Sequence, residues 1–188
     1  MSESLIVITG GPGAGKSTLL EHLHHHHGLN TVEEGGRAII REQLASGGDA
    51  LPWANREAFC QAMLAHALTT RERALDAGGL WLFDRGLPDV LGYARLCGLP
   101  IPEELETAAR ELRYGPTVFL APAWEAIYRN DAERRQDFAE AQRTATIMSE
   151  LYAELGYRVL ELPRGSLEER AEFVLAECPP KVAAADAQ

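Results

Sequence analysis

The fold is decided by residues 5–18, which read Leu-Ile-Val-Ile-Thr-Gly-Gly-Pro-Gly-Ala-Gly-Lys-Ser-Thr. The run at 5–9 is continuously apolar and rich in β-branched residues, a pattern typical of a strand covered on both faces. Residues 16–27 predict a helix, and Gly28 is a suitable residue for its C-terminus. A strand, a glycine-rich loop and a helix in this order predict a loop that binds phosphate.

The loop from Gly10 to Ser17 matches the P-loop pattern G-x-x-x-x-G-K-[ST]. Its glycines let backbone N–H groups turn inward and, with the N-terminus of the following helix, cradle phosphate oxygens. Lys16 would place a cation on the β and γ phosphates of ATP, and the Ser17 hydroxyl would ligate Mg²⁺. The residues expected to bind the nucleotide are Gly11, Pro12, Gly13, Ala14, Gly15, Lys16, Ser17 and Thr18.

The rest of the chain alternates between apolar runs and helical stretches. Further strands are predicted at 30–33, 80–83, 117–120 and 157–162, and further helices at 36–45, 56–77, 102–112, 137–155 and 166–176. This alternation predicts a three-layer α-β-α P-loop NTPase fold with a five-stranded parallel sheet and right-handed crossovers. We expect one domain over residues 1–178 and a tail at 179–188 that frays.

Ligands of such sheets bind beyond the carboxyl ends of the strands, so the residues that follow each strand are candidates for chemistry. The strand at 80–83 runs directly into Asp84. Asp84 could hold Mg²⁺ or accept a proton from a substrate hydroxyl, since both roles need a carboxylate near the γ phosphate. A helix N-cap is the structural alternative. The strand at 117–120 leads into Ala121 and Pro122 with no acid, which favours Asp84.

Several residues near these strand ends are candidates for binding the phosphoryl acceptor. Glu34 and Arg37 follow the second strand three positions apart, where they could contact the acceptor or form a surface ion pair. Arg85 could grip the substrate or form a structural ion pair. Asp89 would share a helix face with Tyr93, four positions later. Trp53 could line the acceptor pocket or anchor its loop on the core.

A charged stretch separates the fourth strand from the next helix, and we expect a lid at about 125–137. Arg129, Arg134 and Arg135 are its candidates for stabilising charge on the transferring phosphoryl group, and a solvated helix face is the alternative. After the last strand, Arg164 could stack on the adenine or belong to a plain loop.

Composition excludes several classes of protein. The net charge of −10 argues against broad binding to nucleic acid or to an anionic membrane. No signal peptide and no run long enough to span a membrane are visible, and three scattered cysteines are typical of a reduced, cytoplasmic protein. The run from His24 to His27, with His22, is read as favourable charge at a helix C-terminus rather than as a biological metal site.

Beyond these patterns, three segments carry a resemblance: EGGRAIIREQL, FDRGLPDVLGYARLCGLP and NDAERRQDFAEA. With the P-loop, they resemble the small bacterial P-loop kinase-like ATPases of the AAA type, related to the nicotinamide riboside kinase domain and to nucleoside and nucleotide kinases. The resemblance covers about residues 5–177. It implies a role for Asp84 in catalysis or Mg²⁺ organisation, substrate contact for Arg85, and positions near the acceptor for Glu34 and Arg37.

Two functions remain open from the sequence. The first is transfer of the γ-phosphoryl group of Mg-ATP to a hydroxyl or phosphate of a small, nucleoside-like or nucleotide-like acceptor. The second is an ATPase that acts as a regulatory switch with a protein partner. A dedicated GTPase is disfavoured, because the N-K-x-D pattern that reads guanine is absent from the sequence.

Overall fold

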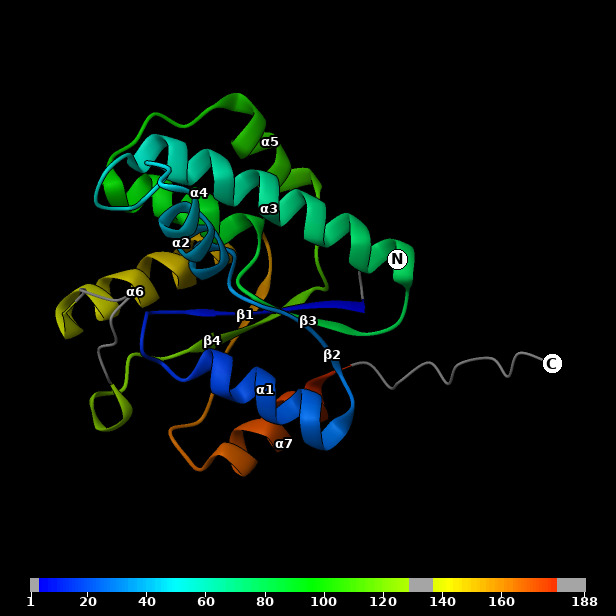
Figure 1. Ribbon diagram of the computed structural model, residues 1–188. Coiled ribbons are helices and arrows are strands. Elements are labelled where there is room, and N and C mark those ends of the chain that lie inside the picture. The colour runs from blue at the N-terminus through cyan, green and yellow to red at the C-terminus, as the bar shows by residue number, and fades with distance from the viewer. Residues whose placement is uncertain (1–3, 129–136, 179–188) are drawn as a thin grey trace.

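The computed structural model describes residues 4–128 and 137–178, which form an α/β fold around one parallel sheet (Figure 1). The strands are β1 (Leu5–Gly10), β2 (Asn30–Val32), β3 (Trp81–Asp84), β4 (Thr117–Ala121) and β5 (Arg158–Glu161). Their order is β2-β3-β1-β4-β5, and every neighbouring pair is parallel. The predicted five-stranded parallel sheet is confirmed, with the P-loop strand β1 at its centre.

Helices cover both faces of the sheet. One face carries α1 (Lys16–His27) and α7 (Leu167–Glu177). The other side carries α2 (Gly35–Ser46), α3 (Arg56–Ala77), α4 (Leu87–Cys97), α5 (Glu103–Glu111) and α6 (Phe138–Glu154), as Figure 1 shows. A short 3₁₀ helix, η2 (Glu125–Ile127), follows β4.

The central strand explains why its sequence is continuously apolar. Leu5 and Val7 pack into the core beneath α3, α4 and α6, whereas Ile6 and Ile8 pack into a second core with α1 and α7. Successive side chains of a strand point to opposite faces, so a strand with a core on each side must be apolar at every position. All of β1 is buried.

Helix α4 is missing from the helices that the sequence predicts. It begins with Pro88 near its first position and contains Gly92, two residues that lower helix propensity in a reading of the sequence alone. Pro88 is compatible with the helix because the first turn needs no N–H donor. Gly92 is favoured by packing, because a Cβ there would lie 2.6 Å from the Met148 sulfur on α6, and the Met148 side chain would have to shift.

The turn from β1 into the P-loop depends on Gly10, which has a φ of +131°. A Cβ at this position would overlap the backbone carbonyl oxygen of Ala121 on β4. We expect Gly10→Ala to destabilise the protein by roughly 2–4 kcal/mol, because overpacking adds to backbone strain. The measurement is urea denaturation followed by circular dichroism.

Gly28 provides the matched control, since its φ is also positive but no atom lies within 4 Å of its virtual Cβ. Gly28→Ala should lose only about 1–2 kcal/mol, the cost of the left-handed backbone. Equal losses in both variants would show that the contact with Ala121 contributes nothing.

Candidate active site

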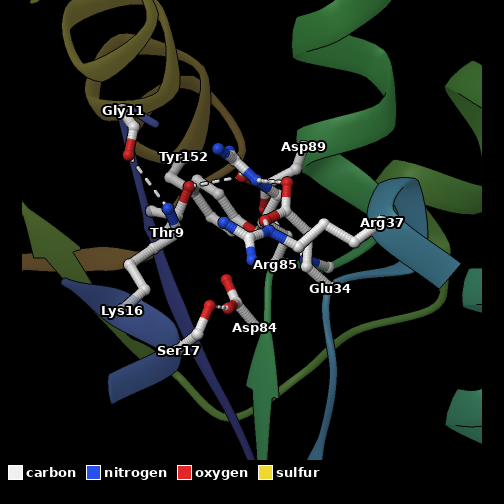
Figure 2. A network of polar contacts seen from close by, with 11 residues as sticks. Thr9, Gly11, Lys16, Ser17, Glu34, Arg37, Asp84, Arg85, Asp89 and Tyr152 are labelled. Atoms are coloured by element: carbon white, nitrogen blue, oxygen red, sulfur yellow. Dashed lines mark hydrogen bonds and ion pairs between the residues drawn. The ribbon is translucent and has the colours of Figure 1, made fainter. Parts of the chain in front are cut away.

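The P-loop connects β1 to α1 and carries the lysine of the motif inward. Lys16 is only 3% exposed, and its Nζ donates a hydrogen bond of 2.9 Å to the backbone carbonyl oxygen of Gly11. The side chain therefore folds back across the loop (Figure 2). A buried ammonium group held over a ring of backbone groups is suited to a phosphate chain.

Ser17, on the first turn of α1, is one of the two residues expected to bind Mg²⁺. Its Oγ donates a hydrogen bond of 2.7 Å to Oδ2 of Asp84, which the end of β3 presents to the loop (Figure 2). Register places Asp84 beside Ile8, two residues before Gly10. The structure thus brings together two residues that the sequence predicted as partners 67 positions apart.

These two side chains fit a magnesium ion. Both offer oxygen atoms, the ligands that Mg²⁺ prefers. The other carboxylate oxygen of Asp84, Oδ1, is buried and has no hydrogen-bond partner among the described residues. A buried carboxylate oxygen without a donor is an unfavourable arrangement that a cation would correct.

The electrostatics of Asp84 agree with this assignment. Burial raises the pKa of the Asp84 carboxyl above its ordinary value, and the charge of Lys16 opposes this effect only in part. The nearby carboxylate of Glu34 raises the pKa further. A carboxylate that burial makes costly to ionise is a group whose charge a bound cation would stabilise.

Arg85, the next residue, joins two acidic residues. Its Nε donates to Oε1 of Glu34 at 3.2 Å, and its Nη1 donates to Oδ1 of Asp89 at 3.1 Å. Burial alone would lower the pKa of Arg85, but Glu34 and Asp89 outweigh it and raise that pKa. Arg85 also has a φ of 75°, unusual for a residue with a side chain. Its guanidinium lies between the two carboxylates, and its backbone N–H donates a hydrogen bond of 3.0 Å to the carbonyl oxygen of Ile8.

Asp89, on the first turn of α4, is the centre of a buried hydrogen-bond network (Figure 2). One oxygen accepts hydrogen bonds from Thr9 and Arg85. The other accepts from the Tyr152 hydroxyl at 2.7 Å and from the backbone N–H of Gly86 at 2.9 Å. This carboxylate therefore ties the P-loop strand, the acidic edge of the cleft and α6 to one point.

The network predicts a large loss of stability in Asp89→Asn. An amide oxygen can replace only part of a carboxylate that accepts four hydrogen bonds, and the ion pair with Arg85 is lost. We expect the free energy of unfolding to fall by roughly 3–5 kcal/mol, since breaking a buried charge pair leaves its partner uncompensated. Urea denaturation measures this fall in the free energy of unfolding.

Tyr152→Phe is the matched control, because it removes one donor and leaves the carboxylate in place. Its expected loss in free energy of unfolding is about 1.5–3 kcal/mol, the usual value of one hydrogen bond to a charged group. If Asp89→Asn lowered the free energy of unfolding no more than Tyr152→Phe does, the network would not have the stabilising role assigned to it.

A cleft of about 530 Å³ opens beside this network, a size typical of small-molecule sites. It extends from Pro12 of the P-loop and Asp84 across to helices α2, α3, α4 and α6. Every residue that the sequence analysis proposed for the acceptor lines it: Glu34, Arg37, Trp53, Arg85 and Asp89. Apolar and aromatic walls accompany them, including Ile40, Phe59, Met63 and Tyr93.

The individual acceptor candidates occupy different positions in this cleft. Arg37 lies 3.6 Å (Nε to Oε2) from Glu34, so the expected pair forms at the cleft rather than on an open surface. Trp53 lines the cleft with 48% of its surface exposed to solvent. Asp89 is almost wholly buried and already accepts four hydrogen bonds, which makes it better placed to position Arg85 than to bind the acceptor itself.

The remaining candidates are less defined by the structure. Arg164 is exposed and lies 3.6 Å from the Glu161 carboxylate, so its contact with adenine stays a prediction. The lid arginines Arg129, Arg134 and Arg135 lie outside the described residues. Within the described ranges, no three His, Cys, Asp or Glu side chains gather in a metal-binding group, and this includes the histidines at the end of α1. No described helix has the length and apolar character to cross a membrane.

Three residues of this region escaped the sequence analysis: Thr9, Tyr152 and Arg170. Thr9 carries a signal, being a hydroxyl residue at the end of an otherwise apolar buried strand. Arg170 carries another, because it occupies the apolar face of α7 with Ala171 and Val174, yet is charged. Tyr152 carries none, since a tyrosine in an amphipathic helix is ordinary core material.

Solved structures with the same architecture include those of a deoxyadenosine kinase and of the NadR protein. Deoxyadenosine kinase from M. mycoides, with the products dCMP and a flexible dCDP bound, matches with a TM-score of 0.63, 16% identity, and coverage of 92% of this chain and 96% of that one. The same enzyme with bound dATP matches with a TM-score of 0.62 and 15% identity, and the match covers 92% of this chain and 97% of that one. The NadR protein in complex with NR matches with a TM-score of 0.66 and 18% identity, over 95% of this chain and 54% of that one. At these identities the likeness establishes the fold.

No curated protein matches the sequence at a significant level. The family comparison is decisive instead, because residues 5–170 match the AAA domain family. That match runs from the first residue of β1 into α7 and includes the P-loop, Asp84 and the cleft residues. The chain belongs to the AAA domain family of P-loop proteins and has the kinase-like α/β fold of its structural neighbours.

Proposed function

We propose that this protein is a phosphotransferase that moves the γ-phosphoryl group of Mg-ATP to a hydroxyl or phosphate of a small, nucleoside-like or nucleotide-like molecule. The P-loop would hold the triphosphate, with Lys16 on the β and γ phosphates. Ser17 and Asp84 would hold Mg²⁺, which would neutralise developing charge on the phosphoryl oxygens. The acceptor would occupy the 530 Å³ cleft.

One observation carries the proposal: the cleft reaches both the P-loop and the carboxylates of Asp84 and Glu34. A regulatory switch needs a site for the triphosphate but has no need of an adjoining small-molecule cleft. A kinase needs both, because the acceptor must lie in line with the γ-phosphorus. The fold shared with deoxyadenosine kinase supports the same class of reaction.

The two carboxylates can divide the chemistry. Asp84 is hydrogen-bonded to Ser17 and is placed for the metal. Glu34 has 17% of its side chain exposed, lines the cleft, and is oriented by Arg85 and Arg37. Glu34 is therefore the candidate that accepts the proton when the acceptor is a hydroxyl. The hydroxyl oxygen would bond to the γ-phosphorus as the bond to the β-phosphate oxygen breaks, and ADP would leave.

The test is incubation of the purified protein with Mg-ATP and a pooled library of nucleosides, nucleotides and sugar alcohols. Mass spectrometry detects any compound that gains one phosphoryl group. Glu34→Gln should reduce phosphorylation of a hydroxyl acceptor by roughly 10²–10⁴-fold, the usual contribution of a general base, with little change in ATP affinity. Arg41→Gln is the control, since Arg41 pairs with Glu33 on the exposed side of α2.

The outcomes separate the two functions. A phosphorylated library member that depends on Glu34 would establish the kinase and name its acceptor. ADP formation with no phosphorylated product would contradict the kinase and favour an ATPase switch with a protein partner.

A further inference from the structure

Arg170 is a buried arginine that packs against the back of the P-loop. It lies on α7, is 4% exposed, and its Nη2 donates a hydrogen bond of 3.0 Å to the backbone carbonyl oxygen of Ala14. Its Nη1 lies 2.8 Å from the position that a Cβ on Gly15 would occupy. The P-loop backbone and this guanidinium are thus in direct contact, although 156 residues separate Ala14 from Arg170.

The charge of Arg170 is not balanced by an acid in the described part of the chain. No ion pair forms to it there, and its Nε is buried without a hydrogen-bond partner. Burial lowers the pKa of Arg170, but an arginine remains protonated in proteins. A buried charge without a counter-charge destabilises a fold, so its presence here calls for a compensating anion.

The contact with Ala14 also fixes the direction of a donor. The C=O of Ala14 and the N–H of Gly15 belong to one planar trans peptide, in which the two groups point in opposite directions. Since Arg170 holds the carbonyl, the Gly15 N–H must point away from Arg170. Among the described residues this N–H has no acceptor. Hydrogen bonds in series also polarise one another, so donation to the carbonyl strengthens the N–H as a donor.

We propose that Arg170 is a positioning residue for the phosphate chain of the nucleotide. It holds the Ala14–Gly15 peptide with its N–H aimed at the phosphates, and it supplies a second buried positive charge behind the loop, in addition to Lys16. The inference rests on the proposed binding of a nucleotide but not on transfer to an acceptor. It predicts that Arg170 contributes more to the binding affinity of a ligand that carries more phosphates.

The experiment compares Arg170→Met and Arg170→Lys with the wild type. Isothermal titration calorimetry gives Kd for Mg-ATP, Mg-ADP and AMP, and thermal unfolding without ligand gives Tm. Arg170→Met should weaken ATP and ADP binding by roughly 10–100-fold and AMP binding far less, as expected when a buried positive charge behind the loop and the fixed direction of the Gly15 N–H are both lost. Arg170→Lys, which keeps the charge, should recover part of the loss.

Arg158→Met is the matched control, because Arg158 lies at the start of β5 with an exposed side chain paired to Glu177. It should leave all three affinities unchanged. In Arg170→Met, the ligand-free Tm should change little, since removal of an uncompensated buried charge offsets the loss of the hydrogen bond to Ala14.

Two results would overturn the proposal. One is a lower Tm in Arg170→Met with the ATP-to-AMP affinity ratio of the wild type, which is the behaviour of a purely structural arginine. The other is equal ATP affinity in all variants. Should Arg170→Met fail to fold, the same ratio measured in Arg170→Lys and Arg170→Gln decides the matter, since only Lys retains charge.

The measurement also separates this inference from the proposed function. A wild-type protein that binds no nucleotide would overturn both. A protein that binds ATP but phosphorylates no acceptor would leave the Arg170 inference intact and contradict only the kinase.

Discussion

Lys16→Ala is expected to abolish detectable binding of Mg-ATP while the fold remains intact. Lys16 is the buried cation of the P-loop, and its Nζ lies 2.9 Å from the Gly11 carbonyl oxygen, at the centre of the loop. Without it, the β and γ phosphates would keep the backbone N–H groups but lose a charge in a site that water barely reaches. We expect Kd for Mg-ATP to rise by at least roughly 100-fold, as for truncation of one member of a buried charge pair.

Lys16→Met is the matched variant, since it keeps the aliphatic stem that packs in the loop and removes only the charge. Calorimetry with ATP and AMP measures both variants, and circular dichroism checks the fold. AMP binding should change little, because AMP lacks the β and γ phosphates that Lys16 is proposed to contact. If either variant bound ATP as tightly as the wild type, residues 10–17 would not be a nucleotide-binding loop.

Asp84→Asn is expected to lower phosphoryl transfer by roughly 10³-fold or more and to raise the stability of the ligand-free protein. The loss of activity follows from the role that we propose for Asp84 at the metal, where removal of a charged ligand would affect the transition state directly. Asparagine keeps the shape of the side chain and can still accept the Ser17 hydrogen bond of 2.7 Å. Turnover at saturating ATP, with Mg²⁺ varied, is the measurement.

The gain in stability follows from the sign of the pKa shift. The pKa of Asp84 is raised in the folded protein, so its ionised form destabilises the fold at neutral pH. As the pH falls through this raised pKa, the folded protein takes up the proton and the destabilisation disappears; it is absent below the unfolded value of about 3.9. The variant should therefore be the more stable protein near pH 7, and the difference should vanish in acid. A less stable variant at pH 7 would contradict this assignment.

The two substitutions affect different parts of one arrangement. Lys16 and Arg170 reach the P-loop from within and from behind, whereas Asp84 meets it from the end of β3. Substitution at Lys16 should weaken binding, and substitution at Asp84 should slow transfer. Measuring Kd and kcat for each variant distinguishes these effects even before the acceptor is known.

Much of the fold could be predicted because it follows from local chemistry. The five strands and most helices are visible in the pattern of apolar residues, and Ser166 caps the N-terminus of α7 in a complete capping box with Glu169, a local signal that the sequence contains. The P-loop and Asp84 could be found because each follows a buried strand directly. Helix α4 could not, because Gly92 is explained by Met148, a residue 56 positions later.

The sequence by itself determined the phosphate loop, the parallel sheet and the set of residues at the carboxyl ends of the strands. Only the tertiary structure decided that Asp89 joins Thr9 to Tyr152, that five acceptor candidates line one cleft, and that Arg170 holds Ala14. The physical reason is range. Spacing along the chain specifies hydrogen bonds and apolar faces within an element, but contacts between elements depend on strand order and helix packing, which place residues 63 to 156 positions apart within hydrogen-bond distance.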